Sequence, residues 1–300
     1  MNLSVVIITF NEEASIARTL ESVKPLVADG KGEIIVVDSG STDRTVEIAK
    51  AFGAKVFVEE WKGYAAQKNS AIDKATGDWI LSLDADEEVS AELATEIGEV
   101  LFLSVGKLLH KFSGRGAWDA WIERKPDLMV TYDDQREGPL TGAEIPRKNF
   151  FMRRWIRWGG FYPDKKLRFF RRGSASFEDR IVHEDAHSDG LTVSLRGALR
   201  HHSYPTLSDY IEHMNRYSSL GAEMVAAKQN GKVRFSVINI VVRPLATFIY
   251  NYFFRLGFLD GREGLLLHLY HAVYVSWKYA KAWELANKSK QVARDSDLSS

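Results

Sequence analysis

Two carboxylates, Asp84 and Asp86, stand one residue apart directly after an apolar run, and this spacing points to metal chemistry. The run, residues 79–83, contains a single serine and is typical of a strand buried on both faces of a parallel sheet. Where such a strand opens into a loop, both carboxylates can converge on one cation. Hard carboxylate oxygens suit Mg²⁺ or Mn²⁺, which bridge proteins to substrate phosphates. The same spacing recurs at residues 295–297, but no strand precedes it, so no such role is predicted there.

The elements that must position these carboxylates alternate between strand and helix along the first hundred residues. Strands are predicted over 3–9, 33–38, 55–58 and 79–83. Helices are predicted from an N-cap at Asn11, from the loop 39–43 through Phe52 with Gly53 as a left-handed cap, and over about 64–76 with Gly77 at the end. This alternation predicts an α/β fold with a mainly parallel sheet. Ligands bind outside the carboxyl ends of such strands, which singles out residues 9–13, 38–43 and 84–86.

Composition and missing motifs exclude several function classes. Forty basic and forty acidic residues cancel, so the charge balance does not favour a nucleic-acid partner. The absence of cysteine excludes disulfides, thiolate catalysis and cysteine-ligated zinc. Residues 1–10 lack the features of a secretory signal and are too short to span a bilayer. Neither a glycine-rich dinucleotide fingerprint nor a P-loop follows the first strand. The loops are acidic instead, and a divalent cation would reconcile them with a diphosphate.

Four motifs in register give the chain a family resemblance over residues 3–90. They are Thr9-Phe-Asn-Glu-Glu13, Val37-Asp-Ser-Gly-Ser-Thr-Asp43, Lys68-Asn69 ahead of Ala75-Thr-Gly77, and Leu83-Asp-Ala-Asp86. Together they resemble family 2 of the nucleotide-sugar glycosyltransferases, which have the GT-A fold, a Rossmann-like, mainly parallel sheet flanked by helices. More narrowly, 37–43, 61–63, 67–69 and 147–151 resemble the bacterial lipopolysaccharide-core glucosyltransferases of that family.

The resemblance implies roles for individual residues in a UDP-sugar site. It implies that Thr9, Glu12 and Asp38 hold the uridine, with Asp38 accepting a hydrogen bond from the uracil N3, and that Lys68 lies near the base and phosphates. It also implies that Asp84 lies toward the ribose and metal and that Asp86 ligates the metal. The matching motifs add three expected nucleotide-contacting residues, Asn11, Ser41 and Ala85. Without the resemblance, Asn11 and Glu12 are interpreted as a helix cap, Asp38 as a turn residue and Lys68 as a solvated helix charge.

The acceptor side is expected in the second part of the sheet, where an inverting transfer needs a carboxylate base to deprotonate the attacking hydroxyl. Two candidates, Asp179 and Glu184, lie in the segment where family 2 enzymes carry their acidic motif. Glu184 is preferred because residues 181–182 place it at another strand end, whereas Asp179 is alternatively a turn residue. His183 is a candidate third metal ligand, with His201 and His202 as alternatives and a packed core histidine as the structural interpretation.

The C-terminal third predicts helices that lie at a membrane interface. A helix is predicted over 207–228, and residues 235–259 are apolar but broken by Arg243 and Arg255, which disfavour a spanning helix. Residues 264–283 continue with leucines, aromatic residues and lysines, typical of a membrane belt. A helical cap on the sheet or a dimer interface is the alternative interpretation.

These observations predict an inverting, metal-dependent hexosyltransferase that uses Mg²⁺ or Mn²⁺ and moves glucose from UDP-glucose to a lipid-linked saccharide such as the lipopolysaccharide inner core. The alternatives are transfer to polyprenyl phosphate, or a non-catalytic nucleotide-sugar-binding protein. The protein is expected to be cytoplasmic and peripherally bound to the inner face of the plasma membrane. A homo-oligomer is a further possible assembly. The predicted domains are a GT-A catalytic domain over 1–205, with a nucleotide-binding half over about 1–103 and an acceptor half over about 143–205, a helical region over 206–287, and a disordered tail over 288–300. The role of residues 104–142 is left open.

Overall fold

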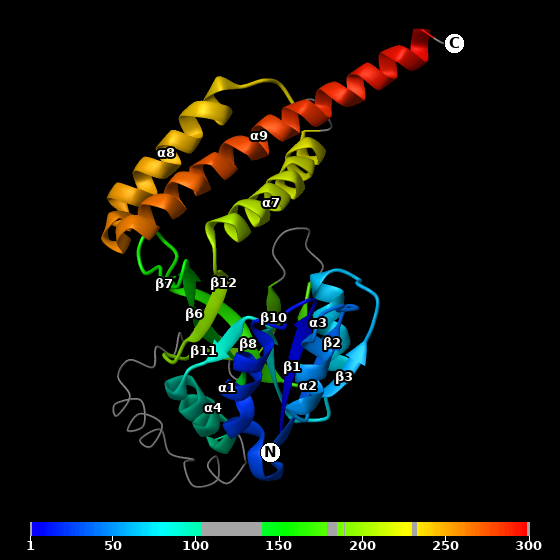
Figure 1. Cartoon of the computed structure of the whole chain (residues 1–300), viewed down its shortest axis with the longest axis vertical. Coiled ribbons are helices and arrows are strands. Elements are labelled where there is room, and N and C mark those ends of the chain that lie inside the picture. Colours follow the sequence, from blue (N-terminus) through cyan, green and yellow to red (C-terminus); the bar gives the residue numbers. More distant parts are fainter. Residues whose placement is uncertain (1, 104–139, 179–184, 189, 230–232, 299–300) are drawn as a thin grey trace. The chain divides into compact units, whose positions relative to one another are not determined.

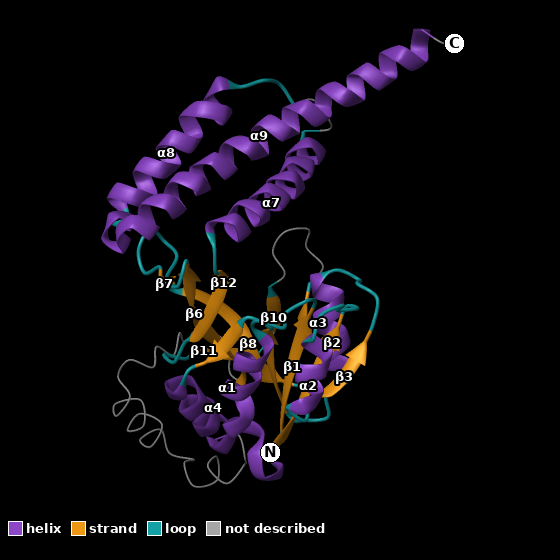
Figure 2. Cartoon of the chain, in the orientation of Figure 1, coloured by secondary structure: helices purple, strands orange, loops and turns teal. Residues whose placement is uncertain are grey.

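The protein is described here from a computed structural model that covers residues 2–103, 140–178, 185–188, 190–229 and 233–298. The chain divides into two compact units. Unit 1 comprises residues 1–148 and 163–201, and unit 2 comprises residues 149–162 and 202–300. Figure 2 shows that unit 1 carries most of the strands and that unit 2 carries the long helices.

The described strands are mostly part of one sheet. They are β1 Leu3–Thr9, β2 Gly32–Asp38, β3 Lys55–Val58, β4 Trp79–Asp84, β5 Glu87–Val89, β6 Leu140–Phe151, β7 Arg154–Trp155, β8 Asp164–Arg171, β9 Ala175–Phe177, β10 Ala186–Ser188, β11 Leu191–Ser194 and β12 Leu199–Tyr204. The sheet order is β3-β2-β1-β4-β8-β6-β12-β5, with β7 and β11 also paired to β6, and β9 pairs with β10 in a separate two-stranded sheet. Strands β1 to β4 are mutually parallel, whereas β8 runs antiparallel to β4.

Helices cover both faces of this sheet in unit 1 (Figure 1). They are α1 Ile16–Val27, the 3₁₀ turn η1 Ala28–Gly30, α2 Thr45–Ala51, α3 Tyr64–Asp73 and α4 Ala91–Leu103. Helix α1 buries Ile16, Leu20 and Val23 with α4 against one face of the sheet. Helix α3 packs Ala65 and Ala71 against the other face. All seven residues of β1 are buried, because helices cover the strand on both sides.

The expected α/β class is confirmed, and several predicted elements match closely. The first strand and the short strand Lys55–Val58 have the predicted bounds, and Gly53 adopts the predicted left-handed conformation with φ +79°. The third helix was predicted to continue to Thr76 but ends at Asp73. It ends early because the backbone N–H and the hydroxyl of Thr76 both donate to Glu33 Oε1, each at 2.7 Å, rather than continuing the helix.

Gly77 does not cap α3. Instead, it lets the backbone at residue 77 pass close to the backbone of residues 2–4. A Cβ atom at this position would lie 2.7 Å from the Ser4 nitrogen and 2.8 Å from the Asn2 oxygen. The backbone nitrogen of Gly77 donates to the Ser4 hydroxyl at 2.8 Å. The glycine therefore allows the chain to enter β4 directly beside the start of β1.

Unit 2 is mainly helical. Its helices are α7 Leu207–Lys228, the π-helical segment η2 Ile238–Val242, α8 Arg243–Ile249, the π-helical segment η3 Tyr250–Phe254, the 3₁₀ turn η4 Gly257–Asp260 and α9 Gly261–Leu298. Helix α7 has the predicted bounds and begins with a capping box between Thr206 and Asp209. Lys281 on α9 donates to four oxygen atoms of Asn215, Ser218 and Ser219 on α7 and so holds the two helices together.

Two expectations for the C-terminal part can be compared with the helices of unit 2. The tail predicted to be disordered over 288–300 is helical as far as Leu298, and residues 284–298 contain neither proline nor glycine to end the helix. Among the described residues no helix is both long enough and apolar enough to cross a membrane.

Candidate functional site

The candidate site lies at the carboxyl ends of β1, β2 and β4 in unit 1. In the parallel pairing of these strands, Thr9 is opposite Asp38 and Ile8 is opposite Asp84. The side chain of Asp38 is fully buried and Thr9 is nearly so, whereas Asp84 is partly exposed. The strand register thus brings the predicted residues Thr9, Asp38 and Asp84 to one edge of the sheet.

Asp38 organises the loop that follows β2. One of its carboxylate oxygens accepts the backbone N–H groups of Gly40 at 3.0 Å and Ser41 at 2.8 Å, and the other accepts the Ser41 hydroxyl. A carboxylate oxygen has room for more than one donor, so the second oxygen retains capacity for a ligand N–H. Ser41 therefore has a structural role as the partner that orients Asp38.

The loops that follow β1 and β2 are joined by hydrogen bonds. The Asn11 backbone N–H donates to the Ser41 hydroxyl at 2.8 Å, and Asn11 Oδ1 accepts the Thr42 N–H at 2.8 Å. The Glu12 N–H donates to the Thr45 hydroxyl at 2.7 Å. Because these bonds run between the loops, residues 11–13 and 41–45 form one connected wall of the site.

Asn11 is not the N-cap that was predicted for the first helix. The helix begins at Ile16, and Asn11 adopts a left-handed conformation with φ +53°, which asparagine tolerates better than most residues. Its side chain bonds to the neighbouring loop instead of to the helix start. The sequence pattern was misleading because Asn and Glu ahead of an apolar repeat are also typical of a cap.

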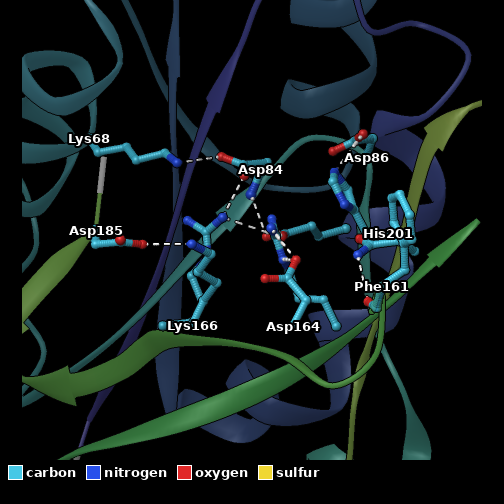
Figure 3. Close-up of polar contacts among 12 residues, drawn as sticks. Lys68, Asp84, Asp86, Phe161, Asp164, Lys166, Asp185 and His201 are labelled. Carbon is cyan, nitrogen blue, oxygen red and sulfur yellow. Dashed lines mark hydrogen bonds and ion pairs between the residues drawn. The ribbon is translucent and has the colours of Figure 1, made fainter. Parts of the chain in front are cut away.

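Asp84 is held by two cationic side chains (Figure 3). Lys68 Nζ on α3 lies 2.9 Å from Asp84 Oδ1, and Arg168 Nη2 on β8 lies 2.6 Å from Oδ2. Burial favours the neutral acid and would raise the pKa of Asp84, but Arg168 and Lys68 outweigh it and hold that pKa well below its usual range. Direct ligation of a metal by Asp84 would require it to give up part of these contacts, and that role stays a prediction.

A second layer of charges surrounds this ion pair. Glu87 is fully buried, accepts the Asp84 N–H at 3.0 Å, and lies 3.3 Å from Arg168 and 3.2 Å from Arg147. Arg147 also pairs with Asp164 at 2.6 Å. The sequence predictions did not include this network. A signal was available, because Arg168 stands between the apolar residues Leu167 and Phe169–Phe170 of β8, and an arginine buried there requires acidic partners.

Asp86 faces His201 rather than Asp84. His201 Nε2 on β12 lies 3.3 Å from Asp86 Oδ2. Burial disfavours the charged ring, but Asp86 outweighs burial and raises the pKa of His201, while His201 lowers the pKa of Asp86. A carboxylate oxygen beside an imidazole nitrogen is a donor set that fits Mn²⁺ better than Mg²⁺. Among the described residues no group of three His, Asp or Glu side chains is placed to hold a metal, so this pair would supply two ligands.

The Ala85 side chain lies in the core under the site. It is 4% exposed, and its backbone oxygen accepts the Thr19 hydroxyl of α1 at 2.7 Å. These contacts hold the turn between Asp84 and Asp86 against α1. The predicted contact of Ala85 with a nucleotide stays a prediction.

Asn69, next to Lys68, ties helix α3 to strand β9. Its side-chain amide donates to the Phe177 oxygen at 2.9 Å and accepts the Phe177 N–H at 2.9 Å, in the manner of a backbone strand pair. The ammonium group of Lys68 also lies 5.2 Å from the Phe177 ring centre. The position of β9 is therefore coupled directly to the helix that carries Lys68.

Three predicted residues lie outside the part of the chain that the structure describes. They are Asp179 and Glu184, the candidate bases, and His183, the candidate third metal ligand. Their roles stay predictions. Of the two alternative histidines, His201 lies beside Asp86, whereas the ring of His202 stacks on Phe150 at 4.9 Å within unit 2.

Glu12 is unfavourable in its charged form because it is largely buried, so we expect the stability of the protein to depend on pH. Burial first, and then the nearby Asp86, raise its pKa from 4.5 to about 7. The folded protein therefore binds this proton more tightly than the unfolded chain, and stability falls as the pH rises from about 4.5 to about 7. We expect Glu12→Gln to stabilise the protein at pH 8, by on the order of 2 kcal/mol, and to have little effect near pH 4.5. Urea unfolding at the two pH values measures this; an equal change at both would contradict it.

Comparisons with known proteins match this site region and extend along the chain. A model of the family described as glycosyl transferase family 2 matches residues 4–101. An uncharacterised glycosyltransferase of Rickettsia typhi is 32% identical over 97% of this chain and 89% of its own length. The lipopolysaccharide core biosynthesis glycosyltransferase LpsC of Rhizobium meliloti is 27% identical over 94% of this chain and 92% of its own length. Among solved structures, glucosyl-3-phosphoglycerate synthase of Mycobacterium tuberculosis, in complex with Mn²⁺, UDP and phosphoglyceric acid, is similar over 29% of this chain and 34% of that one, with 34% identity and a TM-score of 0.27.

Proposed function

The chain belongs to glycosyl transferase family 2, and from that premise we propose that it transfers glucose, with inversion, from UDP-glucose to a lipid-linked saccharide such as the lipopolysaccharide inner core. The acceptor is supported by the nearly full-length similarity to LpsC, whose name assigns that protein to lipopolysaccharide core biosynthesis. The donor is supported by the polar groups gathered at the strand ends. Membership of this family identifies the protein as a glycosyltransferase.

The observation that carries the proposal is that Asp38 and Asp84 end the two strands that flank β1, with Lys68 of α3 paired to Asp84. Asp86 follows in the turn after β4. Asp38 is fixed by its own loop and keeps an oxygen that can accept a hydrogen bond from the uracil N3. Lys68 and Arg168 are cations that lie where a diphosphate would approach Asp84. Arginine and lysine suit phosphate oxygens, so the same cations can exchange a carboxylate for a phosphate.

Asp86 and His201 are the residues that would hold a divalent cation. Their carboxylate and imidazole groups face each other, and loss of the His201 proton would free the ring nitrogen as a ligand. When bound, the cation supplies charge stabilisation for the departing diphosphate. Glu12, whose pKa is raised by burial and then by Asp86, is the acidic neighbour that such a charge would allow to ionise.

The acceptor hydroxyl needs a base, and we assign that role to Glu184, with Asp179 as the competing candidate. Both follow Phe177, which is fastened to α3 by Asn69 beside Lys68. These hydrogen bonds support the proposal that the chain enters the segment with the candidate bases close to Lys68. The chosen carboxylate accepts the hydroxyl proton as the oxygen attacks the anomeric carbon on the face opposite the diphosphate.

A panel of nucleotide sugars tests the proposal. The purified chain is incubated with UDP-glucose, UDP-galactose or GDP-mannose, each with Mn²⁺, Mg²⁺ or a chelator, and the released nucleoside diphosphate is measured. We expect UDP release from UDP-glucose with Mn²⁺ to exceed release from GDP-mannose at least tenfold, and chelation to abolish it. Preference for the guanine donor would overturn the assignment of Asp38. Release that survives chelation would overturn the metal assignment.

Addition of lipopolysaccharide acceptors tests the second half of the proposal. We expect glucose to be incorporated into a truncated core that ends in the inner-core sugars, and not into polyprenyl phosphate. Incorporation into polyprenyl phosphate alone would favour the alternative transfer, which needs no strong base because the phosphate oxygen is already nucleophilic. Binding of UDP-glucose without turnover on any acceptor would favour a non-catalytic protein.

A further inference from the structure

A helical arm in unit 2 exposes an unusual amount of apolar surface. The arm comprises residues 237–255 and is formed by η2, α8 and η3 with their flanking cap residues; these helices follow one another without a break and run beside α9 (Figure 1). Among its outward side chains, Ile238 is 66% exposed and Phe254 is 74% exposed. Exposed apolar surface on this scale marks a binding surface rather than an ordinary solvated face.

The exposed residues of the arm recur every four positions. Two neighbouring columns of residues are exposed. The first is Val237, Val241, Leu245, Ile249 and Phe253, and the second is Ile238, Val242, Ala246, Tyr250 and Phe254. The opposite column, partly or fully buried, is Ile240, Pro244, Phe248, Tyr252. A polar column lies between them and consists of Asn239, Arg243, Thr247, Asn251, Arg255. The arm therefore has an apolar outer half, a packed inner column and a polar edge.

The π-helical segments explain how this repeat forms a straight face. In an α-helix with about 3.6 residues per turn, a four-residue repeat rotates by about 40° with each turn. Over the length of the arm, the exposed residues would wind around the helix. A π-helix makes i→i+5 hydrogen bonds and holds more residues in each turn, so it rotates the repeat in the opposite sense. With η2 and η3 at its two ends, the arm keeps its apolar columns on one side.

The inner column and the polar edge are engaged by α9. The Ser276 hydroxyl donates to the Ile240 oxygen at 2.8 Å, and the Tyr252 ring lies 6.1 Å from the His268 ring. Arg243 donates to the Tyr279 hydroxyl and lies 5.0 Å from its ring centre. These contacts fix the orientation of the arm on α9. The outer columns face away from this contact and are exposed.

The charged residues of the arm segment itself have one sign. Residues 235–259 contain no acidic residue, and their only charged residues are Arg243 and Arg255, both in the polar edge column. The acidic residue that directly follows this segment in the sequence, Asp260, is 3% exposed and accepts the backbone N–H groups of Arg157 and Trp158. An apolar, aromatic face with an arginine edge and no acidic group matches an interface between lipid chains and anionic headgroups.

We propose that the outer face of the arm docks on the surface of an anionic lipid bilayer. Val241, Leu245 and Ile249 enter the boundary of the acyl chains, while Arg255 at the edge contacts headgroup phosphates. A second copy of the same face is a poorer occupant, because it would offer no acidic side chain to these arginines. The proposal goes beyond the transfer chemistry, since it requires neither donor nor acceptor.

Vesicle partitioning tests the proposal with the full chain. Phosphatidylcholine vesicles with and without phosphatidylglycerol are mixed with the protein and sedimented, and the bound fraction gives a partition coefficient. We expect binding to the anionic vesicles. We expect Leu245→Glu to lower the partition coefficient at least about tenfold, because it removes an apolar contact with the acyl chains and adds a charge of the same sign as the headgroups. Val58→Glu is the matched control: Val58 is 63% exposed on β3 in unit 1, and its substitution is expected to leave partitioning unchanged.

Further variants separate the charge from the apolar contact. Arg255→Gln is expected to reduce binding to anionic vesicles while leaving the weaker binding to neutral vesicles unchanged. Equal binding of Leu245→Glu and the parent protein would overturn the proposal, as would equal binding of the parent to neutral and anionic vesicles. A parent dimer that Leu245→Glu converts to a monomer, without vesicle binding by either, would assign the face to a second copy instead. UDP release from UDP-glucose is measured in parallel, so a failure of partitioning is distinct from a failure of the proposed function.

Discussion

Replacing Arg168 with methionine is expected to lower the free energy of unfolding by about 3 to 5 kcal/mol. Arg168 is 4% exposed, and its guanidinium lies 2.6 Å from Asp84 and 3.3 Å from the fully buried Glu87. Methionine fills a similar volume but leaves both carboxylates with less compensating charge in a medium that solvates them poorly. Removal of one partner from a buried ion network typically costs this amount, because the remaining charges stay buried. Urea unfolding at neutral pH measures the change.

Arg200 provides a matched control for this prediction. It pairs with Glu88 at 3.1 Å, but its side chain is half exposed, and Arg200→Met is expected to cost less than about 1 kcal/mol. A loss of similar size in the two variants would show that the Arg168 cluster contributes no more than a surface pair. A cost near zero for Arg168→Met would contradict the prediction and indicate that water enters the site.

Replacing Asp86 with asparagine is expected to reduce sugar transfer about a thousandfold while leaving the fold intact. The substitution preserves the shape of the side chain but removes the charge that faces His201 and that would attract the divalent cation. The loss of an interaction directed at developing charge commonly has effects of this size. A second readout is independent of turnover: the pKa of His201 should fall, since Asp86 raises it, and this is measured by NMR titration.

The Asp-x-Asp near the C-terminus offers the control for this variant. Asp297→Asn changes a residue with the same local spacing, distant in sequence from the candidate site, and is expected to leave transfer unchanged. Undiminished activity in Asp86→Asn would remove Asp86 from the metal site. Reduced activity together with an unchanged His201 pKa would mean that Asp86 acts without contacting His201.

The strands at the centre of unit 1 were the most predictable part of the fold. β1 is apolar along its whole length because it is buried on both faces, and that pattern leaves little freedom in its bounds. The end of α3 was predicted less well, because Glu33, more than forty residues away in sequence, captures Thr76. The left-handed Asn11 was missed for a related reason: its partners Ser41 and Thr42 belong to another loop.

The acidic residues of the candidate site and Lys68 were predicted, whereas the two arginines, Arg147 and Arg168, were missed. Residues such as Asp38 and Asp84 terminate strands, so the rule for parallel sheets placed them together. Arg168 comes from β8, which is antiparallel to β4, and Arg147 comes from β6, which is antiparallel to β8. Both lie far along the chain, and no local pattern pairs them with Asp84. Long-range ion pairs of this kind depend on sheet order, which the local sequence does not specify.

The amide of Asn69 has a consequence for how the enzyme can diversify. A single side chain fixes the backbone of Phe177 to the helix that carries Lys68, and the chain reaches the candidate bases within a few residues of Phe177. Substitutions after Phe177 that change the acceptor preference would therefore also shift α3 and Lys68, and so change the affinity for the donor. In Asn69→Ala, the Michaelis constants for donor and acceptor should rise together. Related enzymes with a different acceptor should carry matching substitutions on α3 that restore the position of Lys68.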